Sequence, residues 1–409
     1  GRAFAKLIAT DGGETIVVGR PPDLRAFKIA DGTTVGAVSF LGADLALLVR
    51  EKTADSDVVG VQRMDSTTGA LTDLVAPTAA AEWLGVSGFC DGTQAAASCG
   101  FFGTVGCSVD EPACADGKAA PCLVLYGKAT PDAAGSTAAF VYDVNAGTST
   151  PLDGASPDRF YVDRGHHLLV WGSTSASPFT SWWNMCTGVR HTCDTWPGPA
   201  IAWRPDGGAL AMYGPKPAFM RILNIAEGTC SAPDPSKTSS VYQAQYAPGS
   251  DRLWWVSAND DAETSFNLWL GDANGGSAVA VATGPDLGGA FSGDGQRLYV
   301  AHNGESNAAL GWVDVNASPP VETVLSSNRG DIGLLGNRRV LFVDHYNVQD
   351  GNGELVLVDM ETGARQSLAR SVTGVTVSGG EAEGADVAYA VRGRVASSRD
   401  GLWLTTLPP

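Results

Sequence analysis

Acidic and imidazole side chains recur in three polar segments, each of which follows a short apolar run. The segments contain Asp260 and Asp261, then His302 and Glu305, and finally Asp344, His345, Asp350, Asn352 and Glu354. Carboxylate and amide oxygens are the ligands that Ca²⁺ prefers. The alternating oxygen donors from Asp350 to Glu354 are typical of the start of a calcium loop, but Leu355 stands where an EF-hand requires glycine. The pattern therefore allows a Ca²⁺ site shared by adjacent loops, but it does not form an EF-hand.

The same residues allow two other interpretations. Asp260, His302, Asp344 and His345 could act as acid and base groups of a hydrolase or lyase that acts on a glycan or an ester. The acidic groups could also form only a hydrated rim, since charged side chains are mostly exposed. The sequence contains no G-x-S-x-G, H-E-x-x-H or P-loop motif, and it identifies no catalytic residue by motif. We therefore favour a protein without catalytic activity.

Eight cysteines indicate disulfide chemistry. Cys186 and Cys193 enclose a short loop, and we expect them to form a pair. The pairing of the others stays open, and they are Cys90, Cys99, Cys107, Cys114, Cys122 and Cys230. Residues 88–121 form a Cys-rich insertion that is also rich in Gly, Ala and Asp, and covalent links could order it. The absence of C-x-x-C argues against a zinc ribbon or a thioredoxin-type site. Disulfides indicate an extracytoplasmic location: periplasm, cell surface or medium.

The acidic and imidazole side chains must be positioned by short predicted strands, which recur along the chain at a regular interval. An apolar run that ends in Asp or Asn is followed four residues later by glycine, as in Asp65 with Gly69 and Asp143 with Gly147. Successive anchors from Asp143 to Asp359 are 41, 40, 47, 43 and 45 residues apart. A second apolar run precedes each copy, and polar Gly/Asp turns stand before several of these runs. The pattern predicts repeats of four short antiparallel strands, which is the period of a β-propeller blade.

We predict an all-β chain that forms a single β-propeller domain over residues 1–409, with eight blades and seven as the alternative. The repeats lie near residues 34–76, 80–152, 157–196, 198–235, 241–284, 287–326, 329–370 and 372–407. Strands within residues 1–30 would help to close the ring by pairing with the last blade. Adjacent residues such as Trp254 and Trp255 should face two different neighbouring blades, because successive strand residues point to opposite faces. The loops between second and third strands would share one end, which brings the three polar segments together.

One repeat resembles a known family. The segment Trp203–Arg–Pro–Asp–Gly–Gly–Ala–Leu–Ala–Met212 is similar to the repeat of TolB-like β-propellers, W-S-P-D-G-x-x-L-A-F. Looser copies are residues 291–300 and 246–249, so the resemblance extends over most of residues 34–407. It implies a TolB-like or WD-repeat-like propeller, and the family includes periplasmic protein-binding scaffolds. Residues 1–30 cannot supply the N-terminal α/β domain of TolB, so the partner of TolB is not carried over.

Charge and hydropathy restrict the partners. The chain has 27 basic and 44 acidic residues, a formal net charge of −17. Nucleic acids and anionic membranes need clustered cationic charge, so we expect neither as a partner. No apolar run is long enough for a membrane-spanning helix. We predict a secreted or cell-surface propeller that acts as a protein-binding scaffold, and the charge favours a basic protein partner. A structural subunit of a surface assembly is the third alternative, and the oligomeric state stays open.

Overall fold

The fold is taken from a computed structural model of the chain. It describes residues 4–10, 13–20, 22–79, 102–105, 107, 113–114, 117, 121–129, 137–152, 159–163, 165–173, 178–195, 197–198, 200–214, 219–238, 240–259, 262–303, 308–335, 339–347, 349–359, 362–380, 384–392 and 401–407. Contacts within the chain divide it into two compact units, Gly1–Trp196 and Pro197–Pro409. Each unit is described by itself.

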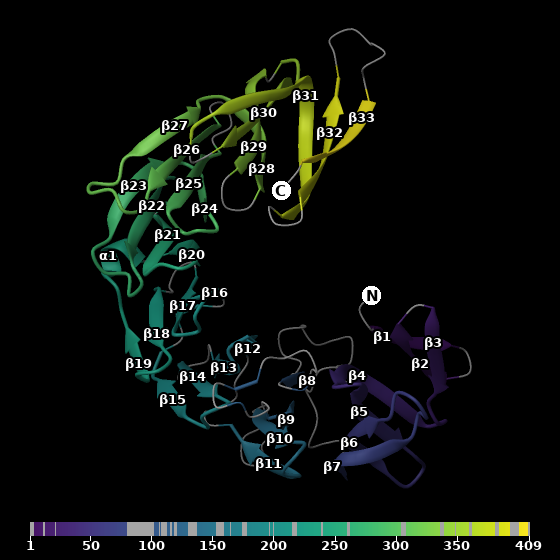
Figure 1. The fold of residues 1–409 in the computed structure, drawn as a ribbon. Helices are drawn as coiled ribbons and strands as arrows, with labels where there is room; N and C mark the ends of the chain where they lie inside the picture. The colour runs from purple at the N-terminus through teal and green to yellow at the C-terminus, as the bar shows by residue number, and fades with distance from the viewer. Residues whose placement is uncertain are drawn as a thin grey trace. The chain divides into compact units, whose positions relative to one another are not determined.

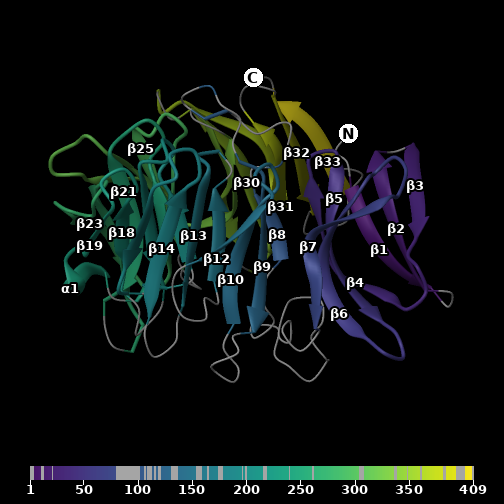
Figure 2. The ribbon, with the colours of Figure 1, turned by 90° about the horizontal axis from the view of Figure 1, so that it is seen from below.

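The described part of the first unit consists of four antiparallel sheets with strands in sequential order. A three-stranded sheet contains β1 (Phe4–Thr10), β2 (Gly13–Arg20) and β3 (Asp23–Lys28). The next contains β4 (Thr33–Leu41), β5 (Asp44–Lys52), β6 (Asp57–Met64) and β7 (Leu71–Ala79). A third contains β8 (Phe102–Val105), β9 (Leu123–Ala129), β10 (Thr137–Asp143) and β11 (Thr148–Pro151). The fourth contains β12 (Arg159–Asp163), β13 (Leu168–Ser173), β14 (Phe179–Asn184) and β15 (Arg190–Cys193), and Figure 2 shows β12 to β14 adjacent in this sheet.

The second unit repeats the same four-stranded pattern (Figure 1). Its first sheet contains β16 (Ala200–Trp203), β17 (Ala209–Tyr213), β18 (Arg221–Asn224) and β19 (Thr229–Ser231), followed by the short helix α1 (Pro235–Thr238). The next contains β20 (Val241–Tyr246), β21 (Arg252–Ala258), β22 (Phe266–Asp272) and β23 (Val279–Gly284). The third contains β24 (Leu287–Phe291), β25 (Arg297–His302), β26 (Ala309–Asp314) and β27 (Glu322–Ser326). The last has six strands: β28 (Arg329–Leu335), β29 (Arg339–Asn347), β30 (Asn352–Asp359), β31 (Arg365–Gly380), β32 (Gly384–Val391) and β33 (Gly401–Leu407).

The recurring Asp–Gly spacing builds the turn between the third and fourth strand of a sheet. Oδ1 of Asp65 accepts hydrogen bonds from the backbone N–H groups of Thr67 (2.8 Å) and Thr68 (2.7 Å). Those hydrogen bonds hold the pKa of the Asp65 carboxyl below its ordinary value. Gly69 then adopts a φ of +75°, a conformation that glycine enters without steric cost. Asp143 and Gly147 repeat the arrangement, so this part of the pattern marks a turn.

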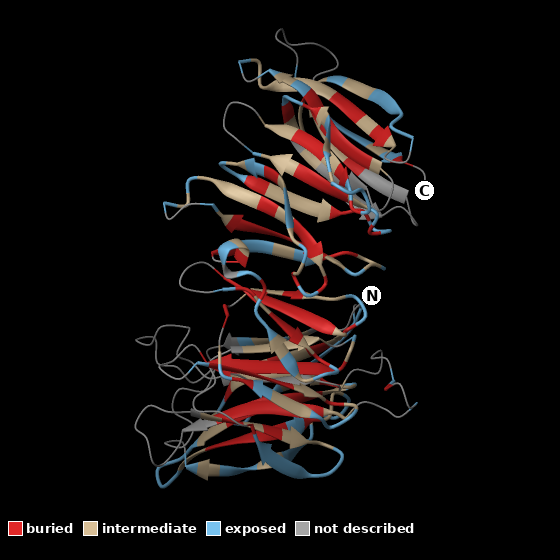
Figure 3. Cartoon of the chain, turned by 90° about the vertical axis from the view of Figure 1, so that its left-hand side faces the viewer, coloured by how far each residue is buried: buried red, intermediate tan, exposed pale blue. Residues whose placement is uncertain are grey.

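Within each unit, neighbouring sheets pack face to face, and middle strands such as β13, β17 and β21 are buried along their length (Figure 3). Trp254 and Trp255 are 3% and 0% exposed. Trp254 packs with Leu298 and Val300 of the following sheet, whereas Trp255 packs with Ala211 of the preceding one. Adjacent residues of one strand thus belong to two different cores, as expected for a blade between two neighbours. The prediction of an all-β fold built from blade-like, four-stranded antiparallel sheets is confirmed.

One strand connects two of the predicted repeats. The first half of β31 pairs with β30, from Val358 opposite Arg365 to Gly353 opposite Val372. Its second half pairs with β32, from Val372 opposite Val391 to Gly380 opposite Gly384. Residues 372–407 therefore extend the preceding sheet to six strands instead of starting a separate one. The N-terminal strands of the first unit form a sheet of their own, and their predicted role in ring closure stays a prediction.

The disulfides correct one expectation. Cys186 is bonded to Cys114, with Cα atoms 5.6 Å apart, so the predicted pair of Cys186 with Cys193 is wrong. The reason is that Cys186 lies in the turn after β14, whereas Cys193 lies at the end of β15 and takes part in another disulfide. Cys107 is bonded to Cys122. Cys230 is also disulfide-bonded.

Parts of the predicted insertion lie outside the described residues, among them Cys90 and Cys99. Within the described part of the chain, no helix combines the length and the hydropathy needed to cross a bilayer.

Candidate functional site

The first predicted polar segment follows β21. Asp260 and Asp261 lie outside the described residues. Their neighbour Glu263 accepts hydrogen bonds from Ser240 Oγ (3.0 Å) and from the hydroxyl of Tyr242. Desolvation, followed by the Glu263 carboxylate, raises the pKa of Tyr242 to about 12. Glu263 therefore fixes this loop to the beginning of β20 in the same sheet.

The second segment follows β25, and its Glu305 lies outside the described residues. His302 Nε2 lies 3.1 Å from Oε1 and 3.2 Å from Oε2 of Glu322, which is the first residue of β27. The pair spans β26 at Gly311, where an added Cβ would lie 2.1 Å from Glu322 Oε1. The missing side chain of Gly311 thus makes room for the carboxylate. Sequence analysis missed Glu322, because it follows a strand turn and carries no motif.

An arginine that sequence analysis did not select completes this region. Arg329, at the start of β28, is buried and donates hydrogen bonds from Nε to Ala309 O (3.0 Å) and from Nη1 to Gly330 O (3.0 Å). Its Nη2 donates to Oδ1 of Asn303, the residue after His302. The guanidinium therefore connects the β25–β26 loop to the next sheet.

The third segment contains a buried carboxylate. Asp344 is 4% exposed, and its Oδ1 accepts hydrogen bonds from Ser326 Oγ (2.6 Å) and His345 N (3.0 Å). Arg365 Nη2 donates to its Oδ2, and Arg365 Nη1 donates to Leu325 O (2.8 Å). Asp344 thus links β29 to β27 and β31. The neighbouring His345 has a φ of +49° and a side chain that is 81% exposed.

The three residues with calcium-like spacing after β29 are Asp350, Asn352 and Glu354, and each of them contacts a different group. Asp350 Oδ2 accepts a hydrogen bond from Asn347 Nδ2 (2.9 Å), and Glu354 Oε1 accepts one from Ser367 Oγ (2.5 Å). The amide of Asn352 donates to the carbonyl of Arg392 (3.1 Å). Each group faces a different partner. Among the described residues, no three acidic or imidazole groups of the predicted cluster come within 4.8 Å of one another, so these contacts give the predicted Ca²⁺ site no support.

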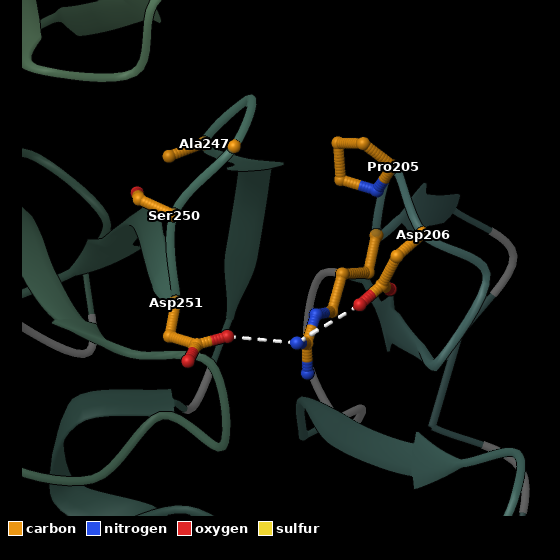
Figure 4. Close-up of a pocket in the computed structure, with 7 residues that line it drawn as sticks. Pro205, Asp206, Ala247, Ser250 and Asp251 are labelled. Carbon is orange, nitrogen blue, oxygen red and sulfur yellow. Dashed lines mark hydrogen bonds and ion pairs between the residues drawn. The ribbon is translucent and has the colours of Figure 1, made fainter.

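A cleft lies elsewhere in the second unit, between the β16–β17 turn and the β20–β21 turn (Figure 4). Its volume is about 450 Å³, and it is lined by Arg204, Pro205, Asp206, Ala247, Gly249, Ser250 and Asp251. Arg204 Nη2 lies 2.7 Å from Asp251 Oδ1 and 3.0 Å from Asp206 Oδ2. The side chains of Asp206 and Asp251 are 55% and 78% exposed. Two exposed carboxylates against one guanidinium give the cleft a net negative charge.

The cleft is formed by two copies of the repeat that resembles TolB-like propellers. In the sequence, both segments are recognised as polar turns and as copies of that repeat, and neither of them alone indicates a cleft. The cleft depends on the two turns being adjacent, and the signal that could have found it is the acidic residue Asp251 at the position where the other copy has Gly208.

The comparisons with known proteins concern the fold. No protein-family model matches the chain, and no curated protein matches it. The tricorn protease aligns with 97% of this chain at 11% identity and a TM-score of 0.36, and the chain spans 44% of that protein's length. TolB from Acinetobacter baumannii aligns over 78% of this chain and 79% of its own, at 13% identity and a TM-score of 0.30. An oligogalacturonate lyase in complex with manganese aligns over 70% and 86%, at 12% identity and a TM-score of 0.35. The chain resembles β-propeller proteins at the level of the fold and at low identity.

Proposed function

We propose that this chain is an extracytoplasmic propeller scaffold that binds a basic protein and carries out no reaction at the predicted loop cluster. The observation that carries the proposal is the use of the candidate groups within the fold. His302 faces Glu322, Asp344 faces Ser326 and Arg365, and Glu354 faces Ser367. Side chains with such partners fix loops in place, and rigid loops on a repeated framework are suited to recognition.

The same contacts weaken the hydrolase or lyase alternative. A general acid or base must lie within hydrogen-bond reach of its substrate. Asp344 is buried, its Oδ1 accepts hydrogen bonds from Ser326 and from His345 N, and its Oδ2 accepts one from Arg365 and lies 3.3 Å from His345 Nδ1, so both of its oxygens are already partnered within the fold. The Nε2 atom of His302 faces Glu322. Only the exposed ring of His345 remains accessible among the described candidates, and a single exposed imidazole does not assemble a catalytic site.

The cleft at Arg204 supports a basic partner. Its net charge is negative, and Asp206 and Asp251 are the more exposed of its charged groups. A lysine or arginine side chain of a partner could enter and pair with them. The formal net charge of −17 would accelerate the encounter with a basic protein, most strongly at low ionic strength.

Two further parts of the proposal concern the architecture and the compartment. The repeat predicts eight blades, with seven as the alternative, that close into a ring, and both the blade count and the closure belong to the proposal. Disulfides such as Cys107–Cys122 and Cys114–Cys186 support an oxidising compartment, where such bonds persist.

The proposal is tested with the purified chain immobilised and exposed to an envelope extract at low and at high salt. We expect retention of a basic protein that is lost at high salt and reduced in the Asp206→Asn/Asp251→Asn variant, whose cleft is cationic. Asp55→Asn/Asp31→Asn is the matched control, since it removes the same charge from exposed positions outside the cleft. If nothing is retained at low salt, or if both variants retain as much as the wild type, the proposal is wrong.

A further inference from the structure

A buried histidine without hydrogen-bond partners lies beside a disulfide in the first unit. His167 is 4% exposed, and neither Nδ1 nor Nε2 has a partner. Buried polar groups in proteins nearly always have one, so an unpaired imidazole in a core needs an explanation. The residue is also held at a φ of +53°, which non-glycine residues seldom adopt. Both features are typical of a group that the fold holds for a purpose other than packing.

The position of His167 is fixed by its backbone. Met185 N donates a hydrogen bond of 2.9 Å to His167 O, which joins the β12–β13 turn to the β14–β15 turn. Cys186 follows Met185 directly, and its own N–H donates to Asn184 Oδ1 at 3.1 Å. The imidazole and the Cys186 sulfur are therefore presented by two adjacent turns at one end of the same sheet.

The third residue of the cluster is Cys114, which is bonded to Cys186. The ligand atoms of Cys114, His167 and Cys186 all lie within 4.8 Å of one another, and they form the one such set among the described residues. Cys114 is buried, whereas Cys186 is half-buried. Two sulfurs and one imidazole nitrogen are the protein ligands of a Cys₂His zinc site, which takes water as its fourth ligand.

We propose that Cys114, His167 and Cys186 form a redox-gated zinc site, of which the disulfide is the closed, metal-free state. A dithiol reductant opens it. The Sγ–Sγ bond breaks, the two cysteines gain two electrons and two protons, and the dithiol becomes a cyclic disulfide. Zn²⁺ then displaces the two thiol protons to solvent and binds both thiolates and one nitrogen of neutral His167.

Geometry and charge both permit this step. Two Zn–S bonds of about 2.3 Å in a tetrahedral site separate the sulfurs by roughly 3.8 Å. The Cα atoms, 5.6 Å apart, allow that separation by side-chain rotation. Two thiolates neutralise Zn²⁺, so the occupied site carries no net charge into a buried environment. Cys114 and His167 are 53 residues apart in the sequence, and His167 and Cys186 are 19 apart. The site therefore has no C-x-x-C motif by which the sequence could reveal it.

Co²⁺ titration of the reduced full chain tests the proposal, since Co²⁺ reports thiolate ligation and tetrahedral geometry by absorption. We expect one tight site per chain after reduction and none in the oxidised chain. His167→Asn should weaken Co²⁺ binding at least tenfold, and asparagine is chosen because it tolerates positive φ. The matched control is His166→Asn, whose imidazole faces Asp163 Oδ2 at 2.7 Å and should bind as the wild type does. Equal binding by His167→Asn, no binding after reduction, or equal binding by the oxidised chain would overturn the proposal.

Reduction also frees other cysteines, so a second measurement follows Cys114 and Cys186 directly. In the Cys107→Ser/Cys122→Ser background, Zn²⁺ should shift the dithiol–disulfide equilibrium of Cys114 with Cys186 toward the reduced form. The shift should disappear in His167→Asn. The dithiol–disulfide equilibrium of each variant is compared with and without Zn²⁺. The result is therefore decisive even if a substitution lowers the stability of the fold. An unchanged equilibrium in the parent background contradicts the site.

Discussion

His302 and Glu322 meet across a strand that separates them. Nε2 of His302 at the end of β25 lies 3.1 Å from Oε1 of Glu322 at the start of β27, and β26 runs between them. Gly311 of β26 leaves the space that the carboxylate occupies. The pair holds the end of β25 to the beginning of β27. His302 was a candidate ligand because it lies in a polar segment, but this contact gives it a structural role.

Gly311→Ala should therefore destabilise the protein. The new Cβ would lie 2.1 Å from Glu322 Oε1 and would displace the carboxylate from His302. We expect a loss of about 1–3 kcal/mol in the free energy of unfolding, measured by urea titration. Gly288→Ala is the control from the same sheet, because its added Cβ meets only ordinary contacts at 3.7 and 3.9 Å. Equal stability of the two variants would show that the space at Gly311 is not needed.

The two tryptophans of β21 should contribute independently. Trp254→Ala and Trp255→Ala each open a cavity in a different core and should each cost about 3–5 kcal/mol, measured by chemical unfolding. Leu402→Ala, at an 80% exposed position, should stay within about 0.5 kcal/mol of the wild type. If either tryptophan variant is as stable as Leu402→Ala, that face of the sheet is not packed against a neighbour.

The raised pKa of Tyr242, at about 12, predicts a loss of stability at alkaline pH. Folding favours the neutral phenol, so the contribution of Tyr242 is complete below the ordinary tyrosine pKa of about 10 and is lost as the pH rises to about 12. The difference in ultraviolet absorption between the wild type and Tyr242→Phe should report a phenol that titrates near pH 12. A difference spectrum that titrates near pH 10 would mean that Glu263 and burial do not act on this hydroxyl.

The disulfide connectivity can be read directly. A non-reducing digest should yield a peptide that joins Cys114 to Cys186 and none that joins Cys186 to Cys193. The bond closes a loop of 72 residues, compared with 15 for Cys107 and Cys122. Removing it by paired serine substitutions should therefore cost about 4 kcal/mol, compared with about 3 kcal/mol for the shorter loop. The opposite order of stability would contradict the loop-closure account.

The architecture was largely predictable from the sequence. Strand patterns and turn residues act locally, and the Asp65–Gly69 spacing predicts a turn because the aspartate caps its own backbone. The division of Trp254 and Trp255 between two cores follows from the alternation of side chains along a strand. The continuation of β31 into the last strands did not follow, because Ser371 and Gly374 suggest a boundary between two repeats, whereas the strand runs on through them with Ser371 at a φ of +58° and a register shift between Val372 and Gly374.

The candidate site was predicted less well, because its contacts join residues far apart in the sequence. Asp344 and His302 were recognised by type and position. Their partners Arg365 and Glu322 lie on other strands and have no motif. The pair of Cys186 with Cys193 was expected from proximity in the sequence, whereas the fold places Cys114 beside Cys186. Periodicity thus identifies strands and turns, but side-chain partners depend on the packing of sheets.

A double-mutant cycle between Asp344 and Arg365 tests the central claim most directly, which is that the loop cluster stabilises the scaffold and performs no chemistry. Asp344→Asn, Arg365→Met and the double variant are compared by urea unfolding. Because Asp344 is buried and Arg365 donates to it, we predict an interaction energy of about 1–3 kcal/mol. Retention of the basic partner should be unchanged in every variant that remains folded. An interaction energy of zero, with partner binding lost in a folded Asp344→Asn variant, would contradict the account.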